Sequence, residues 1–456
     1  FHPLPPDDPN LSLQRGRIHE FFKYTKPHRK LLEQIELVII DEISMVRADI
    51  IDAIDRILRV YSHNLREPFG GKQLLLVGDV FQLEPVVKND ERDILNRFYP
   101  TPYFFSARVF GQIDLVSIEL QKVYRQTDPV FVSVLDHIRT NTAGAADLQL
   151  LNTRYGSQIE ESEADMYITL ATRRDTVDSI NEKKLAELPG DPITFEGVIE
   201  GDFPESSLPT SQELVLKPGA QIIFIKNDFD RRWVNGTIGV ISGIDEEEET
   251  IYVITDDGKE CDVKRESWRN IRYRYNEKTK EIEEEVLGSF TQYPIRLAWA
   301  ITVHKSQGLT FSRVVIDFTG GVFAGGQAYV ALSRCTSLEG IQLKKPISRA
   351  DVFVRPEIVN FAGRFNNRQA IDKALKQAQA DVQYVAAARA FDKGDMEECL
   401  EQFFRAIHSR YDIEKPAPRR LIRRKLGIIN TLKEQNRRLK EQLQEQQERL
   451  RQYAHE

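Results

Sequence analysis

Two carboxylates stand side by side where a strand should end. Asp41 and Glu42 directly follow the apolar run Leu37–Ile40. In phosphoryl transfer, a carboxylate in the place of Asp41 holds Mg²⁺ through water, and one in the place of Glu42 polarises the attacking water. An ordinary acidic turn after a strand would have the same sequence, so the neighbouring motifs decide between the two interpretations.

A glutamine and an arginine follow the next two apolar runs. Gln82 lies in GDVFQLEPV (78–86), just past the run Gln73–Val77, and could hydrogen-bond a γ-phosphate. Arg125 comes soon after the run Leu115–Leu120, and a guanidinium that reaches a γ-phosphate contributes roughly 10³–10⁵ in rate. The alternatives are a turn with an incidental glutamine and a solvated surface arginine.

A polar turn and a second arginine lie further along the chain. His304, Lys305 and Ser306 separate an apolar segment from Gly308. Such a turn could meet a DNA phosphate on one side and a nucleotide on the other. Arg334 lies in a helix-like segment and is placed to act as a second arginine finger.

The segment NGTIG (235–239) supplies Asn235, Gly236 and a second glycine. A plain hairpin turn has the same sequence signature and competes with the functional interpretation.

The elements that must position these residues alternate between strand and helix. Leu37–Ile40, Gln73–Val77 and Leu115–Leu120 are predicted as buried strands, and Ile50–Val60 has helical spacing. Strands that are almost wholly apolar indicate a parallel sheet covered on both faces. Ligands of such sheets bind beyond the carboxyl ends of the strands, where both acidic turns fall.

A second α/β unit follows, and a β-rich segment interrupts it. Helices are predicted at Asp128–Thr140 and near Gly326–Ser333, and strands at Met166–Leu170 and Val314–Phe318. Between them, short alternating runs are separated by NG, DG and PG turns, which predicts a small β barrel inserted into the unit.

Beyond Asp351 the sequence is helical, with a turn at DKGD. Its last part carries apolar or amide residues in 4,3,4,3,4 spacing, which is typical of a coiled-coil seam: Leu432, Asn436, Leu439, Leu443, Gln446 and Leu450. An Asn within the seam would fix its register. A short, Gln-rich solvated helix is the alternative.

Charge and composition limit the classes of function. The net charge of the 456 residues is −7, yet residues 415–456 hold 12 Lys/Arg against 5 Asp/Glu. If the body of the protein binds DNA, it does so through a local groove and not through a basic surface. Cys261, Cys335 and Cys399 are far apart, so a zinc site is not expected and a reducing compartment is. No apolar run approaches the length of a membrane span, so no membrane partner is expected.

In order and spacing, five segments resemble motifs of the Pif-one/RecD-like DNA helicases of superfamily one, branch B. They are IIDEISMV, GDVFQLEPV, VYRQ, TVHKSQGLTF and YVALSRCTSLEGI, and they lie between residues 37 and 341. The resemblance implies an ATP-dependent helicase that moves 5′ to 3′ on single-stranded DNA and unwinds duplex or fork junctions, with ATP and Mg²⁺ as cofactors.

The resemblance also implies an α/β fold of two RecA-like parallel-sheet lobes, the first incomplete, with an SH3-like β-barrel insert and a helical, coiled-coil tail. The expected segments are a wedge remnant (1–36), the first lobe (37–126), the second lobe (127–191 and 293–350), the insert (192–292), a helical extension (351–415) and a basic linker with a coiled coil (416–456).

The family's site residues can be placed on this sequence. The ATP site is expected to contain Asp41, which holds Mg²⁺ through water, together with Glu42, Gln82, Arg125, Gln307, Gly308 and Arg334. The DNA site is expected to contain Thr172, Asn235, Gly236, His304, Lys305 and Ser306. Phe21 and Phe22 resemble an aromatic pair of the wedge, where either stacking on bases or burial in the lobe would explain them.

One departure from the family stands out. The phosphate-binding segment G-x-x-x-x-G-K-[ST] does not occur in the sequence, and FGGKQ (69–73) lacks both the first glycine and the hydroxyl. We therefore expect an N-terminally truncated helicase that is inactive by itself. The alternative is a non-catalytic DNA-binding or scaffold protein that oligomerises through residues 429–453, by binding a second copy or another protein. The expected location is the cytoplasm, with the nucleoid, in a bacterium, and the nucleus or mitochondrion in a eukaryote.

Overall fold

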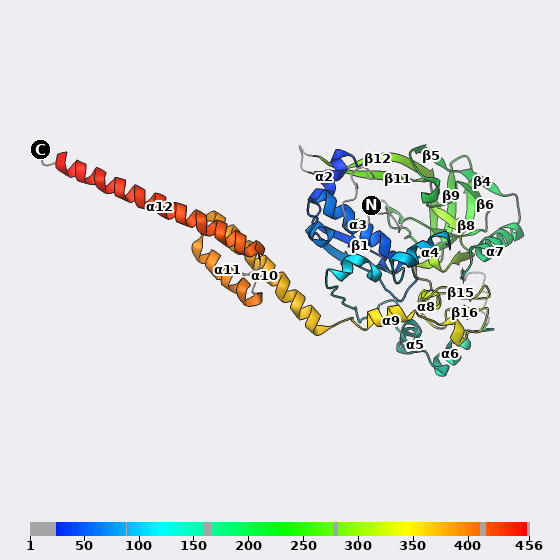
Figure 1. Ribbon diagram of the computed structural model, residues 1–456. Coiled ribbons are helices and arrows are strands. Elements are labelled where there is room, and N and C mark those ends of the chain that lie inside the picture. The colour runs from blue at the N-terminus through cyan, green and yellow to red at the C-terminus, as the bar shows by residue number, and fades with distance from the viewer. Residues whose placement is uncertain (1–23, 88, 158–165, 277–280, 411–415, 454–456) are drawn as a thin grey trace. The chain divides into compact units, whose positions relative to one another are not determined.

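The computed structural model describes residues 24–87, 89–157, 166–276, 281–410 and 416–453 (Figure 1). The chain divides into two compact units. The first comprises Phe1–Leu115 with Leu120–Arg364, and the second comprises Val116–Glu119 with Phe365–Glu456. The predicted pair Phe21 and Phe22 lies outside the described residues. No helix in the described part of the chain is long and apolar enough to span a membrane.

The first lobe is built on two parallel strands. β1 (Leu37–Ile40) pairs with β2 (Gln73–Leu76) in parallel, so that both strands end at the same edge. The strands expected here are confirmed. The remaining elements are α2 (Lys26–Gln34), η2 (Ile43–Met45), α3 (Ala48–Tyr61), η3 (Pro68–Gly71), α4 (Asn89–Phe98), η4 (Phe104–Ser106) and η5 (Arg108–Gly111).

Helix α3 holds the loops of the first lobe through its buried side chains. Its apolar residues are almost all buried, and so are several of its charged ones. Asp55 binds Arg59 one turn away at 2.8 Å. Asp52 accepts hydrogen bonds from the Tyr99 hydroxyl at 2.9 Å and from the Val109 backbone amide at 3.1 Å. Because these buried groups are paired, they tie the following loops to the helix.

Two expectations for the first lobe were wrong. Leu115–Leu120 forms no strand, and Leu120 is 90% exposed. The sheet is also covered unevenly, because Ile39 is 59% exposed and Leu75 47% exposed. A segment of residues with high β-propensity forms a strand only where a partner strand is available to share backbone hydrogen bonds. Within the described residues, β1 and β2 pair only with each other.

The second lobe has a four-stranded parallel sheet in the order β14–β3–β15–β16. Its strands are β3 (Ile168–Ala171), β14 (Ala300–Thr302), β15 (Val314–Asp317) and β16 (Ile341–Leu343). The other elements are α5 (Pro129–Arg139), α6 (Ala145–Asn152), α7 (Arg174–Glu187), η7 (His304–Ser306), α8 (Gln327–Ser333), η8 (Arg349–Asp351) and α9 (Pro356–Ala362). β3 and β15 are buried along their whole length, which confirms the predicted α/β unit.

The insert is entirely antiparallel. A five-stranded sheet runs β10–β9–β8–β7–β13, a three-stranded sheet β11–β12–β5, and a two-stranded one β4–β6. The bounds are β4 (Ile193–Glu196), β5 (Val198–Gly201), η6 (Glu205–Ser207), β6 (Glu213–Leu216), β7 (Gln221–Phe224), β8 (Ile238–Asp245), β9 (Thr250–Thr255), β10 (Glu260–Val263), β11 (Glu266–Asn276), β12 (Glu281–Gln292) and β13 (Ile295–Leu297). Since β13 pairs with β7, the sheet extends past the expected boundary at residue 292.

The second unit consists of α10 (Arg368–Lys393), α11 (Met396–Ser409) and α12 (Pro416–Tyr453). The predicted DKGD turn separates α10 from α11, with Gly394 in the left-handed region. The basic stretch after residue 415 is not a linker, because it forms the first turns of α12. α9 belongs to the first unit, so the helical extension begins near residue 365 and not at 351.

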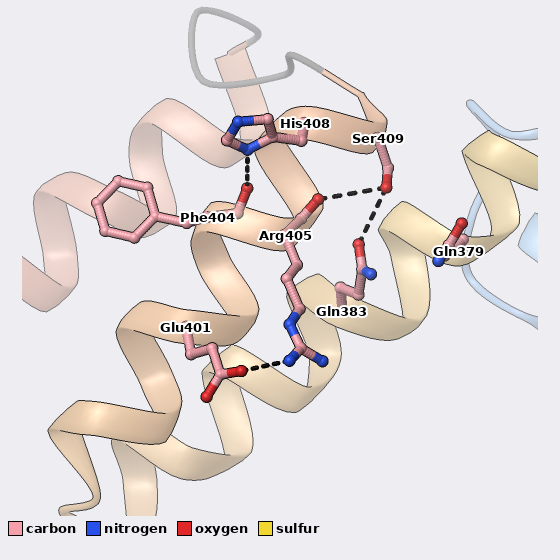
Figure 2. Close-up of a pocket in the computed structure, with 7 residues that line it drawn as sticks. All are labelled: Gln379, Gln383, Glu401, Phe404, Arg405, His408 and Ser409. Carbon is pink, nitrogen blue, oxygen red and sulfur yellow. Dashed lines mark hydrogen bonds and ion pairs between the residues drawn. The ribbon is translucent and has the colours of Figure 1, made fainter.

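One face of the α10–α11 pair carries a shallow pocket (Figure 2). Its polar groups largely bind one another. Ser409 Oγ donates to Gln383 Oε1 at 3.2 Å, His408 Nδ1 donates to the Phe404 carbonyl at 2.8 Å, and Arg405 pairs with Glu401. Of these three contacts, the Ser409–Gln383 bond joins α11 to α10 and the other two lie within α11. None of the predicted site residues lines the pocket.

Candidate nucleotide and nucleic-acid site

The Asp-Glu turn is a strained bend at the end of β1. Glu42 has φ +48°, a left-handed conformation that non-glycine residues rarely adopt. The bend is held by the Ile43 amide, which donates to the Val77 carbonyl at 3.0 Å, and by the Glu42 amide, which donates to Asp41 Oδ1 at 2.8 Å. Both carboxylate side chains are exposed. The fold therefore presents two adjacent carboxylates at the carboxyl edge of the sheet.

Gly78, which sequence reasoning did not single out, makes this arrangement possible. It starts the loop after β2 with φ +151°. A Cβ at this position would lie 2.9 Å from the Ile43 amide nitrogen. The two acidic turns can therefore approach each other only because residue 78 has no side chain.

The loop that carries Gln82 is anchored in the second lobe. Leu83 is fully buried and belongs to the core cluster of that lobe. Inside the loop, the Asp79 carbonyl accepts from the Gln82 amide at 3.0 Å. A Cβ on Gly326 would lie 2.3 Å from the carbonyl oxygens of both Phe81 and Gln82. The start of α8 thus touches the backbone next to the predicted sensor glutamine.

Side chains of the second lobe also hold this loop. Arg139 on α5 forms an ion pair with Asp79, with Nε 3.5 Å from Oδ1, and its guanidinium lies 4.5 Å from the centre of the Phe81 ring. Tyr329 on α8 hydrogen-bonds Asp79, and burial together with the Asp79 charge raises the pKa of its hydroxyl. Arg355 pairs with Glu84 in the same loop at 3.3 Å. Sequence reasoning missed Arg139, Tyr329 and Arg355, because nothing in their neighbourhood marks them as partners of a distant loop.

Arg334 is a buried cation without a carboxylate partner among the described residues. It is 2% exposed at the end of α8. Its guanidinium donates to the Val330 carbonyl at 3.1 Å and to the Ser333 hydroxyl at 3.2 Å, and it lies 3.4 Å from the Leu309 carbonyl. Burial lowers its pKa to about 10, and the positive charge of Arg125 adds to this shift.

Groups from both lobes surround Arg334. The negative charges of Glu42 and Asp79 act on it and oppose the lowering of its pKa. Arg125 donates to the Ser333 carbonyl at 3.3 Å. The neighbouring Gln126, which the sequence did not single out, donates to the same carbonyl at 2.9 Å. Glu42 and both predicted arginine fingers are thereby brought together near the end of α8, and Gln82 lies in the adjoining loop.

The turn 304–309 lies on the other side of Arg334, whose Nη1 is 3.5 Å from the Ser306 carbonyl. Gln307 is half-buried, and its Nε2 has no hydrogen-bond partner among the described residues. Gly308 is exposed with φ +77°, and a Cβ there would meet nothing within 4 Å. A donor without a partner and an open backbone are both suited to an added polar ligand.

The predicted DNA contacts divide into exposed and buried groups. Lys305 and Asn235 are exposed, and His304 is half-buried with its pKa lowered by burial. Ser306 is fully buried, and its hydroxyl donates to the Val303 carbonyl at 2.7 Å. Thr172 is 4% exposed, and its hydroxyl is enclosed by the lobe. In this conformation the side chains of Ser306 and Thr172 therefore do not reach the surface.

Lys305 lies in a locally basic environment. Burial lowers its pKa, and the positive charges of Arg296 and Arg174 lower it further. Gly236 brings the insert to the same region, because a Cβ there, at φ +100°, would lie 2.8 Å from Leu309 Cδ2. The NGTIG turn and the HKS turn are thus neighbours, although 68 residues separate Gly236 from His304.

The predicted metal contact is the Asp-Glu turn. In the described part of the chain, no group of three or more His, Cys, Asp or Glu side chains is placed to hold an ion. The predicted Mg²⁺ contact through Asp41 therefore rests on one exposed carboxylate, which suits an ion held mainly by water and substrate phosphates.

Comparisons with known proteins found relatives of this chain in both sequence and structure. The family model "PIF1-like helicase" matches residues 17–141. The ATP-dependent DNA helicase PIF1 of Homo sapiens is 35% identical over 312 residues, which cover 67% of this chain and 45% of that protein. The ATP-dependent DNA helicase Pif1 of Campylobacter jejuni is 34% identical over 323 residues, covering 68% of this chain and 69% of that protein. The chain thus spans less than half the length of the human relative.

Solved structures match as well. Pif1 from Bacteroides sp. in complex with ADP-AlF4 superposes with a TM-score of 0.70 at 39% identity, covering 80% of each chain. Bacteroides Pif1 bound to single-stranded DNA gives a TM-score of 0.57 at 39% identity. A structure of DNA unwinding at forked duplex by two coordinating Pif1 helicases gives 0.55 at 38% identity, covering 80% of this chain and 79% of that one.

Proposed function

Since the chain belongs to the PIF1-like helicase family, we propose that it supplies part of the motor of an ATP-dependent DNA helicase. Such a motor translocates 5′ to 3′ on single-stranded DNA and unwinds duplex at fork junctions. The energy comes from ATP hydrolysis between the two lobes, with Mg²⁺ as the metal.

The buried charge of Arg334 carries this proposal. A guanidinium removed from water is costly unless an anion compensates it. Around Arg334 the chain offers carbonyl and hydroxyl oxygens but, within the described residues, no ion pair. A nucleotide phosphate between the lobes would supply the missing charge. The lobes would then close more firmly with nucleotide than without it.

The other residues have matching roles. Asp41 would hold Mg²⁺ through water, and the metal would neutralise charge on the phosphates. Glu42 would orient and polarise the attacking water, and Gln82 would hydrogen-bond the γ-phosphate. Arg125 adds a second positive charge next to Arg334. The unpaired amide of Gln307 and the open backbone of Gly308 suit contacts with the nucleotide.

Hydrolysis also needs a phosphate-binding loop, and G-x-x-x-x-G-K-[ST] does not occur in the sequence. We therefore propose that residues 1–456 alone hydrolyse ATP negligibly. The same observation favours one alternative, a non-catalytic DNA-binding or scaffold protein with a helicase fold. This alternative does not explain why Glu42, Gln82, Arg125 and Arg334 are all present, because a protein that does not hydrolyse ATP would not need the four residues together.

Single-stranded DNA is the proposed polymer substrate, because a solved structure of Bacteroides Pif1 is bound to it. The proposed contact surface contains the exposed Lys305 and Asn235, the half-buried His304 and the backbone at Gly236. Lys305 provides the main charge for a phosphate, because Arg296 and Arg174 make its surroundings positive. Self-association through residues 429–453 is a further part of the proposal.

The DNA part of the proposal is tested with the 456-residue chain and a fluorescent oligo-dT. Binding is measured by anisotropy over a range of salt concentrations. We expect Lys305→Ala to weaken binding and to reduce the slope of log affinity against log salt by about 0.7, the value for one phosphate contact on a single strand. Lys259→Ala, in an exposed turn of the insert, is the control and should change neither quantity. Absence of oligo-dT binding by the wild-type chain would overturn the proposal.

A further inference from the structure

Helix α12 exposes a stripe of leucines that nothing in the described chain covers. The helix is continuous from Pro416 to Tyr453. At the seam positions, Leu432 is 53% exposed, Leu439 61%, Leu443 56% and Leu450 68%. Single exposed apolar residues are normal on a protein surface, but a regular seam of four leucines indicates a partner.

The charged residues of the same helix are already paired on its other side. Glu434 forms ion pairs with Arg437 at 2.8 Å and with Arg438 at 3.5 Å, and Arg437 lies 3.8 Å from Glu441. In the heptad that the seam defines, with Asn436 at position a and Leu439 at position d, these four residues take the outer positions b, c and f. The outer face is thus charged and satisfied, whereas the seam carries no charge.

We propose that α12 pairs with α12 of a second copy of this chain as a parallel, two-stranded coiled coil whose register Asn436 sets. This deepens the proposed self-association and does not depend on the ATP site. In this arrangement Asn436 faces Asn436, and each seam leucine faces its own copy. An Asn at one a position specifies register and the two-stranded state at some cost in stability.

The flanking residues favour the parallel orientation. In a parallel pair, position g of one helix lies near position e of the next heptad in the other helix. This places Gln435 near Lys440 and Gln442 near Gln447, so no like charges meet. The antiparallel alignment that keeps every seam position paired would place Lys440 opposite Lys440. A second copy in the parallel orientation therefore fits the surface better than an inverted copy.

Two measurements test the pairing with the whole 456-residue chain. Light scattering on a sizing column should give twice the chain mass for wild type and a single chain mass for Leu439→Asp/Leu443→Asp. Gln444→Asp, at outer position b, is the matched control and should keep the doubled mass. Oligo-dT binding shows that each variant is folded. A single chain mass for wild type over the micromolar range, or an unchanged mass for the double variant, would overturn the pairing.

Orientation and register are tested by disulfide formation in a Cys399→Ser background. In the parallel register, Gln446→Cys faces its own copy and should cross-link under mild oxidation, whereas Gln444→Cys points outward and should not. If the helices were antiparallel, Gln446→Cys alone would stay uncross-linked, and a mixture of Asn436→Cys and Gln446→Cys chains would form the bond instead. That result would contradict the parallel orientation. Failure of either test leaves the DNA-binding experiment unaffected, so the two proposals are judged separately.

Discussion

At the scale of single residues, the candidate site is defined by charged groups from both lobes. Asp41 and Glu42 are exposed on one lobe, and Arg334 on the other is buried with no ion pair among the described residues. Charged residues are rarely buried unpaired unless a ligand completes them. Catalytic machinery for a highly charged substrate would have this distribution before the substrate arrives.

Replacing Arg334 by methionine should separate stability from function. Arg334→Met keeps much of the side-chain volume and removes the buried charge. We expect the free energy of unfolding without nucleotide to rise by roughly 1–4 kcal/mol, which is the gain in stability found when apolar residues of similar volume replace buried ionic groups. Urea unfolding of the 456-residue chain measures this, and Arg269→Met, on an exposed position of β11, should stay within about 0.5 kcal/mol of wild type. A fall in stability for Arg334→Met would show that its charge is satisfied within the chain.

The residues that could do chemistry were easier to single out from the sequence than the residues that support them. Asp41, Glu42, Gln82, Arg125 and Arg334 could all be singled out, because each follows an apolar run or lies in a segment typical of the family. Their partners could not be singled out. An ion pair between α5 and the loop after β2 depends on how two lobes pack, and such a contact leaves no periodicity or spacing in the chain.

At the scale of elements, the loop 78–86 belongs to the first lobe and packs against the second. It starts at the end of β2, inserts Leu83 into the core of the second lobe and contacts α5 and α8. A loop tied to both lobes moves when either lobe moves. If Gln82 contacts the γ-phosphate as proposed, a change there would be transmitted directly to α8, which ends at Ser333 with Arg334 as its C-cap.

Gly326→Ala should break this link. A Cβ would collide with the Phe81 and Gln82 carbonyls at 2.3 Å, and φ +77° is unfavourable for alanine. We expect a loss of roughly 1–3 kcal/mol in the free energy of unfolding, the usual cost of such strain. Thermal or urea unfolding measures the loss. Gly325→Ala is the matched control, because its Cβ would meet neighbours only at 3.7 Å or more. Equal stability of the two variants would contradict the close approach of α8 to the loop.

Most of the strands and helices could be predicted from local pattern, and the exceptions have tertiary causes. The run Leu115–Leu120 has the composition of a strand, but its backbone groups form hydrogen bonds with Asn366 instead of with a neighbouring strand. The Asn366 amide donates to the Ser117 carbonyl, and the Glu119 amide donates to the Asn366 side chain, both at 3.0 Å. The expected boundary at residue 292 places β13 in the second lobe, because a strand of three residues is too short for its sequence pattern to show which sheet it joins.

At the scale of the whole molecule, the lobes and the tail are separate compact units. The lobes and the insert form the first unit, and α10, α11 and α12 form the second. The candidate ATP and DNA residues all lie in the first unit, and the leucine seam lies in the second. The proposed catalysis and the proposed self-association should therefore respond to different substitutions.

The central claim is that this chain supplies the carboxylate and arginine side of an ATP site in a DNA motor. The most direct test is steady-state ATP hydrolysis, with and without oligo-dT, by two proteins. One is the 456-residue chain, and the other is the same chain joined to the phosphate-binding segment of the Bacteroides relative. We expect negligible turnover by the first and DNA-stimulated turnover by the second, lost on Glu42→Gln. A folded, DNA-binding fusion without Glu42-dependent turnover would contradict the account, as would Glu42-dependent turnover by the 456 residues alone.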